Sequence, residues 1–141
     1  MIRKAVASDL PALTDLAVKL WPDHDLDELA VELKEILEKE DAAFFLVKNG
    51  GGFAQCQLRY DYVEGTESSP VGYLEGIYVE ESCRRQGLAR ELLAACEYWA
   101  REKGCREFAS DCELTNTQSL KFHLSLGFDE ANRIICFTKK L

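Results

Sequence analysis

The sequence is poor in the residue patterns that bind metals. It has only two histidines, and its six cysteines include no Cys-x-x-Cys pair of the kind that holds zinc. We therefore expect no metal. Without an export signal, the cysteines are expected to be free thiols in a reducing compartment: Cys56, Cys83, Cys96, Cys105, Cys112 and Cys136.

Long apolar runs are also missing. No stretch approaches the roughly 18 residues needed to span a bilayer, and Asp9 interrupts the N-terminal segment before a secretory signal could form. With 47% hydrophobic and 30% charged residues, the composition is typical of a soluble globular protein. We expect one domain over residues 1–141, no membrane partner and a cytoplasmic location.

Positive charge is in the minority, with 17 Lys and Arg residues against 25 Asp and Glu residues and a net charge of -8. A nucleic-acid partner is not expected, because there is no basic surplus to neutralise phosphates. An acidic cleft would attract a cationic small molecule. An acidic surface that only aids solubility explains the same charge.

Hydrophobic periodicity predicts an α/β fold with a mixed central sheet flanked by helices, in the order β-α-α-β-β-β-α-β-α-β. The expected strands cover residues 2–6, 43–48, 53–60, 73–79, 107–111 and 134–139. The expected helices run from a cap at Ser8 to about Leu20, over 26–37, from about Leu88 to Lys103, and over 117–126. The crossover from Tyr73 to Asp111 should give two parallel strands.

The loop over residues 79–90 joins a strand to a helix and is the most informative segment. Gly87 and Ala89 are small, so a ligand can come close to the backbone. Loop amides and the helix N-terminus favour an anion, which predicts a pyrophosphate site. Three arginines add positive charge: Arg84, Arg85 and Arg90. The loop matches neither the P-loop nor G-x-G-x-x-G, and a basic turn with an ordinary glycine is the alternative.

A second pattern lies near the C-terminus. Asn116, Ser119 and His123 are spaced by three and four residues, which places them on one helix face or at its cap. The helix then ends at Gly127-Phe128. A polar stripe of this kind is also compatible with an ordinary exposed surface.

Together the two segments resemble the GNAT acetyltransferase superfamily. Its loop pattern, R/Q-x-x-G-x-G/A, is matched by Arg84, Gly87 and Ala89. Its later helix pattern, N-x-x-S/A-x-x-x-Y-x-x-x-G-F, is matched by Asn116, Ser119, Gly127 and Phe128. The departure is His123, which stands where the family usually has tyrosine.

The resemblance implies an acetyltransferase that uses acetyl-CoA as co-substrate, with direct attack of an amine on the thioester. It implies that backbone groups of three strand residues pair with the pantetheine arm: Ile77, Tyr78 and Val79. The pyrophosphate would lie on Arg84, Arg85, Gln86, Gly87, Leu88, Ala89 and Arg90, and Asn116 would help to fix the cofactor. The usual tyrosine protonates the leaving thiolate. His123 is the candidate for that role, with packing beside the cofactor as the alternative.

Two carboxylates are candidates for binding the acceptor amine and removing its proton. Glu75 lies in an apolar stretch, where an unpaired carboxylate is costly, and Gly76 after it indicates a bulge or bend. Asp111 lies at the carboxyl end of its strand, where ligands of open α/β sheets bind. Both are therefore expected to approach one cleft and to hold an ammonium group. Capping of the next turn is the alternative for Asp111.

Further segments resemble the aminoglycoside 6'-N-acetyltransferases nearly end to end. They are Leu20-Trp21-Pro22, residues 59–65 and 68–71, Leu74-Glu75-Gly76-Ile77, and residues 104–107 and 109–111. The resemblance implies that the antibiotic site is lined by Trp21, Tyr62, Glu75 and Asp111. Relatives often carry an acidic residue after the Gly-Phe pair, and the nearby candidates for that position are Asp129, Glu130 and Asn132. If Asn132 is the matching residue, one acidic contact is lost.

The same resemblance implies a homodimer. Two other hypotheses stay open at this point. One is an acetyltransferase for a different small polyamine or for a protein amino group. The other is a module that senses coenzyme A without catalysis.

Overall fold

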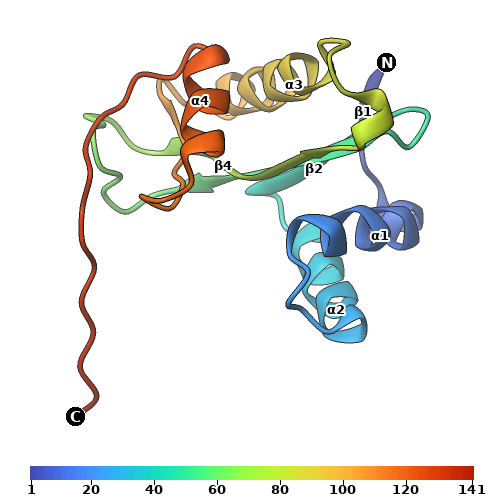
Figure 1. Ribbon diagram of the computed structural model, residues 1–141, viewed down its shortest axis with the longest axis horizontal. Helices are drawn as coiled ribbons and strands as arrows, with labels where there is room; N and C mark the ends of the chain where they lie inside the picture. Colours follow the sequence, from blue (N-terminus) through green and yellow to red (C-terminus); the bar gives the residue numbers. More distant parts are fainter.

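The computed structural model describes all 141 residues and contains one five-stranded mixed sheet with helices on both faces (Figure 1). The strands are β1 (Ile2–Lys4), β2 (Ala42–Val47), β3 (Gly52–Arg59), β4 (Val71–Val79) and β5 (Phe108–Ala109). The helices are α1 (Leu10–Leu20), α2 (Leu26–Leu37), α3 (Leu88–Glu102) and α4 (Thr117–Ser125). The strands are ordered β1-β2-β3-β4-β5, and all neighbours are antiparallel except the parallel pair β4 and β5.

The core lies on both faces of β2. Its side chains alternate: Phe44 and Leu46 pack with α1 and α2, whereas Phe45 and Val47 pack with α3. All six residues of β2 are buried, as expected for a strand covered on both sides. Figure 1 shows α1 and α2 on one side of the sheet and α3 on the other. No helix is long and apolar enough to cross a membrane.

Helix starts follow local capping chemistry. The bounds of α2 match the prediction, and the carboxylate of Asp25 accepts the backbone N–H of Glu28 at 3.1 Å. The predicted Ser8 cap is wrong. Instead, the carboxylate of Asp9 accepts the backbone N–H of Val6 at 2.8 Å and pairs with Arg3. An aspartate can make both contacts at once, because its two oxygens offer several acceptor sites.

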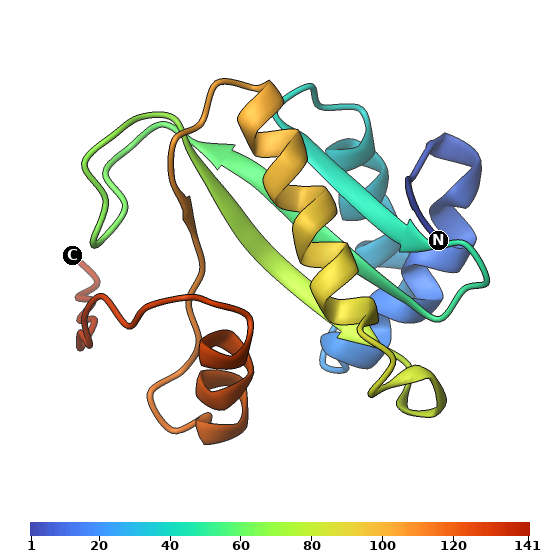
Figure 2. The ribbon, with the colours of Figure 1, turned by 90° about the horizontal axis from the view of Figure 1, so that it is seen from above.

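The predicted crossover from β4 through α3 to β5 is confirmed. The two strands run parallel but share only two residue pairs, Gly72 with Phe108 and Tyr73 with Ala109. Beyond these pairs the chains separate, as Figure 2 shows. The register between β3 and β4 also shifts at this level and leaves Glu75 as an additional residue on β4. The predicted irregularity is therefore present, one residue before Gly76.

The strand predicted over residues 134–139 is wrong. Residues 129–141, which we call the C-terminal arm, contain no helix or strand and make no backbone–backbone hydrogen bond within the chain. The arm extends away from the sheet (Figure 1), and Ile134, Ile135 and Phe137 are 62%, 74% and 87% exposed. A strand forms only against a neighbouring strand, and this chain places none beside the arm.

Candidate active site

The loop between β4 and α3 leaves open space above a helix N-terminus. Gly87 directly precedes α3 and has a left-handed φ of 80°, a conformation that favours glycine. A Cβ atom built on Gly87 would meet nothing within 4 Å. The first amides of α3 can therefore be approached by an anion.

The three arginines of this loop have different environments. The Nε atom of Arg84 donates to the carbonyl of Val79 at 2.9 Å, which ties the loop to the end of β4. Arg90 donates to the carbonyl of Ser125 at 2.8 Å and connects α3 with α4. Arg85 is exposed and makes no hydrogen bond within the chain. Arg84 thus holds the loop and Arg90 holds α3 against α4, whereas the side chain of Arg85 is exposed to solvent.

The other predicted cofactor-binding residues lie around the same opening. Gln86 is exposed, Ala89 is half-buried and Leu88 is buried, so only the backbone of Leu88 could reach a ligand. Ile77 and Tyr78 pair with β3 on one side. On its other side β4 has no partner strand beyond Tyr73, because β5 ends there. This open edge leads toward the loop and offers backbone groups to an extended ligand such as a pantetheine arm.

Helix α4 brings a histidine to the point where β4 and β5 separate. Asn116 caps this helix, because its Oδ1 atom accepts the backbone N–H of Ser119 at 3.0 Å. The Nδ1 atom of His123 lies 2.8 Å from the carbonyl of Ser119, and its Nε2 atom lies 2.8 Å from the hydroxyl of Ser110. A carbonyl only accepts, so Nδ1 carries a proton. In a neutral ring, Nε2 therefore accepts from Ser110.

This tautomer bears on the predicted acid role of His123. The ring can donate from Nε2 only when it is charged, and Ser110 stands directly in front of that atom. A proton from His123 would therefore pass through the Ser110 hydroxyl. Ser110, which also lies 3.4 Å from the carbonyl of Leu74, was not singled out from the sequence.

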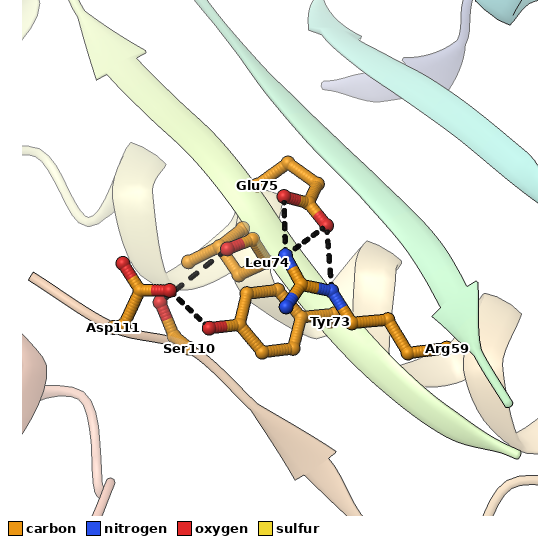
Figure 3. A network of polar contacts seen from close by, with 6 residues as sticks. All are labelled: Arg59, Tyr73, Leu74, Glu75, Ser110 and Asp111. Atoms are coloured by element: carbon orange, nitrogen blue, oxygen red, sulfur yellow. Dashed lines mark hydrogen bonds and ion pairs between the residues drawn. The ribbon is translucent and has the colours of Figure 1, made fainter. Parts of the chain in front are cut away.

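The two predicted carboxylates are linked through residues that the sequence did not point to. The guanidinium of Arg59 contacts both carboxylate oxygens of Glu75, with N–O distances of 3.0 and 3.2 Å. The same guanidinium stacks over the ring of Tyr73, with its central carbon 3.4 Å from the ring centroid. The hydroxyl of Tyr73 donates to Asp111. Figure 3 shows this connected set.

Burial and the positive charge of Arg59 have opposite effects on the pKa of Glu75. Burial raises the pKa of Glu75, and the Arg59 guanidinium opposes that rise through its charge and its hydrogen bonds. Burial, followed by the hydrogen bond to Asp111, raises the pKa of Tyr73, so the phenol stays a proton donor. Asp111 accepts from Tyr73 and from no backbone N–H, so it does not cap the following turn.

The predicted acceptor-binding residues are divided between two cavities. The larger cavity, of about 1060 Å³, is lined by Tyr62, Asp111, His123 and Asn132, together with Arg59 and Tyr73. The smaller, of about 330 Å³, is lined by Trp21 and Glu75. The expectation that Glu75 and Asp111 face one cleft is therefore corrected. They lie at neighbouring cavities and are connected through Arg59 and Tyr73.

Trp21 has its position because Gly76 has no side chain. A Cβ atom on Gly76 would lie 2.6 Å from the Trp21 ring, and this ring also packs edge-on against Phe53. Trp21 thus fills the α1 side of β4 beside Glu75. In the larger cavity, Tyr62 is 76% exposed, and the side-chain amide of Asn132 donates to Glu64 at 2.6 Å.

No group of three or more His, Cys, Asp or Glu side chains is arranged to hold a metal ion. All six cysteines are free thiols, and only Cys112 and Cys136 are exposed. The polar groups at the site are the carboxylates of Glu75 and Asp111, the guanidinium of Arg59, the phenol of Tyr73 and the Ser110–His123 pair. This set can bind a cation and transfer protons.

Comparison with known proteins gives consistent results. A sequence model of the Acetyltransferase (GNAT) family matches residues 10–128. An aminoglycoside N(6')-acetyltransferase type 1 of Stenotrophomonas maltophilia is 43% identical, with 99% of this chain and 93% of that protein covered. The enzyme of the same description from Salmonella typhimurium is 42% identical, with 99% and 98% covered.

Solved structures are similar over the whole chain. The structure of AAC(6')-Iy with the bisubstrate analog CoA-S-monomethyl-acetylneamine has a TM-score of 0.94 and 42% identity, and covers 100% of this chain and 98% of that one. AAC(6')-Iy in complex with CoA has a TM-score of 0.95 and 42% identity, with 100% and 95% covered.

Proposed function

This chain belongs to the acetyltransferase (GNAT) family, and from that premise we propose that it is an acetyl-CoA-dependent aminoglycoside 6'-N-acetyltransferase. Such an enzyme confers resistance by acetylating the 6'-amino group of the antibiotic. The observation that carries the proposal is the connected pair of carboxylates, Glu75 and Asp111, at the point where β4 and β5 separate. The relatives named above are acetyltransferases that act on this class of acceptor.

The residues present fit acetyl-CoA. The open space above Gly87, the amides of α3 and the exposed Arg85 would hold the pyrophosphate. The open edge of β4 from Leu74 to Val79 would pair with the pantetheine arm. When bound there, acetyl-CoA supplies the acetyl group as an activated thioester.

The chain's own residues then act on the acceptor amine and its protons. An amine with a pKa of about 10 is an ammonium ion at neutral pH and must lose a proton before it attacks. Glu75 binds this ammonium and accepts its proton, because burial raises the pKa of Glu75 and makes it a better proton acceptor than an ordinary glutamate. Asp111 contacts the acceptor from the neighbouring cavity and is connected to Glu75 through Tyr73 and Arg59. The pair formed by Ser110 and His123 would return a proton at the point where β4 and β5 separate. The amine attacks directly, with no covalent enzyme intermediate.

The test is product formation by the purified protein with acetyl-CoA and one acceptor at a time. We expect acetylated kanamycin and tobramycin, little turnover of spermidine, and no turnover of an aminoglycoside that carries a hydroxyl group at the 6' position. Mass spectrometry is the suitable assay, since a thiol-reactive dye would also label Cys112 and Cys136. Faster turnover of spermidine or of a peptide would favour the other amine acceptors. Binding of acetyl-CoA without any turnover would indicate a sensing module.

We also propose that residues 1–141 act as one N-acetyltransferase domain, which forms a homodimer in the cytoplasm. Six free thiols support a reducing compartment. The C-terminal arm supports the dimer, because its apolar residues have no partner within the chain and a second copy would cover them. Light scattering should give twice the mass of the chain. Replacing Ile135 and Phe137 with glutamate should give a monomer, and a monomeric wild-type protein would contradict the proposal.

A further inference from the structure

Arg59 supplies Glu75 with a cation from within the chain. Its guanidinium makes three N–O contacts with the carboxylate, and the Glu75 side chain is only 19% exposed. No other basic side chain contacts this carboxylate. An incoming ammonium group therefore meets a carboxylate whose charge is already compensated.

Arg59 also lies at the boundary between the two cavities of the site. It lines the larger cavity together with Tyr73 and Asp111, while its ion-pair partner Glu75 lines the smaller one. Figure 3 shows the guanidinium between Glu75 on one side and the Tyr73 ring on the other. A ligand that extends from the larger cavity toward Glu75 therefore meets Arg59, which contacts both Tyr73 and Glu75.

We propose that Arg59 is a specificity-determining residue whose guanidinium competes with the substrate ammonium for the Glu75 carboxylate. On this view, acceptor binding displaces the guanidinium from Glu75 and opens the passage between the two cavities. This inference rests on the proposed function, since it concerns the cation that Glu75 binds during acetyl transfer. The Arg59 side chain is 39% exposed and lies at the end of β3, so it can swing toward solvent.

The exchange favours cations because a poorly exposed carboxylate is costly to leave unpaired. A neutral ligand that removed Arg59 would leave Glu75 without a partner, whereas an ammonium group replaces one charge-assisted contact with another. A cationic acceptor can therefore open the passage, and a neutral one cannot.

The same exchange assists product release. Acetylation converts the ammonium into a neutral amide, which has lost the charge that competed with Arg59 for Glu75. The guanidinium can then pair with Glu75 again and close the passage behind the product. Renewed pairing of Arg59 with Glu75 would thus lower the affinity of the enzyme for its acetylated product.

A purely structural role for Arg59 makes the opposite predictions. If Arg59 only holds Glu75 in place, its loss should misplace the carboxylate and weaken acceptor binding. If Arg59 competes with the acceptor, its loss should strengthen binding of both acceptor and product. The direction of the change in affinity therefore separates the two roles.

The experiment compares Arg59→Met, which keeps a long apolar stem without charge, with Arg59→Lys, which keeps a cation. In Arg59→Met we expect the KM for kanamycin and the inhibition constant of acetylated kanamycin each to fall about 10-fold, without a rise in kcat, because the competing charge-assisted contact is gone. Arg59→Lys should stay near wild type. A higher KM in Arg59→Met, with a melting temperature near that of wild type, overturns the proposal.

A second measurement uses the wild-type enzyme and does not depend on catalysis. The side-chain Nε–H resonance of Arg59 can be assigned by its absence in Arg59→Lys. We expect saturating kanamycin to shift this resonance and to speed its exchange with water. If the enzyme acetylates kanamycin and this resonance does not change, the inference is wrong and the proposed function stands. If kanamycin displaces Arg59 but is not acetylated, the proposed function is wrong.

Discussion

Two glycines at opposite ends of α3 provide a matched test of the cofactor site. Gly87 precedes the helix with φ 80°, and Gly104 follows it with φ 92°. A Cβ atom on either residue would meet nothing within 4 Å. Alanine at either position therefore suffers the same left-handed strain, about 1–2 kcal/mol, and no clash. For a chain of this size, that strain should lower the melting temperature by roughly 3–8 °C in both variants.

The two variants should differ in their binding of acetyl-CoA. In Gly87→Ala the new methyl group stands in the space through which a pyrophosphate must approach the backbone amides. Loss of one charge-assisted hydrogen bond, worth about 1.5–3 kcal/mol, should weaken binding at least ~10-fold. Gly104→Ala lies outside the loop and should keep wild-type affinity.

Calorimetric titration with acetyl-CoA, read beside a thermal melt of each variant, measures both quantities. Wild-type affinity in a folded Gly87→Ala protein would refute the assignment of this loop to the pyrophosphate. An equal loss of affinity in both variants would show that strain in α3, rather than blocked access, weakens binding.

Three further predictions concern individual side chains. Glu75→Gln and Asp111→Asn should each lower kcat/KM for kanamycin at least ~10-fold with little change in acetyl-CoA affinity; an equal loss for every amine, with a lower melting temperature, would indicate a structural role. His123→Phe should lower kcat, and an unchanged kcat and pH–rate profile would leave His123 with packing alone. The hydrogen bond from Arg3 holds the pKa of Asp9 at about 2. Because that value is depressed, the stabilisation by Asp9 is present above about pH 4 and lost as the pH falls through about 2. Asp9→Ala should therefore lose up to ~1 kcal/mol at pH 7 and flatten the acid limb of a denaturation series.

Local patterns in the sequence predicted the parts of the fold that depend on local chemistry. The bounds of α2 follow from one apolar stripe and the Asp25 cap. The crossover to β5 follows from the handedness rule for parallel strands, and the loop at Gly87 from the need for small residues near an anion. None of these required knowledge of distant neighbours.

The failures concern partners that sequence spacing does not specify. The apolar residues from Ile134 to Phe137 are typical of a strand. A strand also needs a neighbouring strand to pair with, and the hydrophobic pattern does not identify that neighbour. Arg59 was missed for a related reason. It reads as a basic residue at the end of a strand, and only the pairing of β3 with β4 brings it to Glu75.

The bulge on β4 explains how a carboxylate can occupy the middle of a strand that is covered on both faces. Leu74 and Ile77 pack with the α3 cluster, while Gly76 and Tyr78 face α1 and α2. The side-chain alternation of β4 therefore continues from Leu74 directly to Gly76, and Glu75 is the additional residue. A regular strand would have to place Glu75 in the core or shift every later side chain to the other face. Because the bulge removes that conflict, Glu75 can turn toward Arg59, and the carboxylate forms an ion pair near the point where β4 and β5 separate.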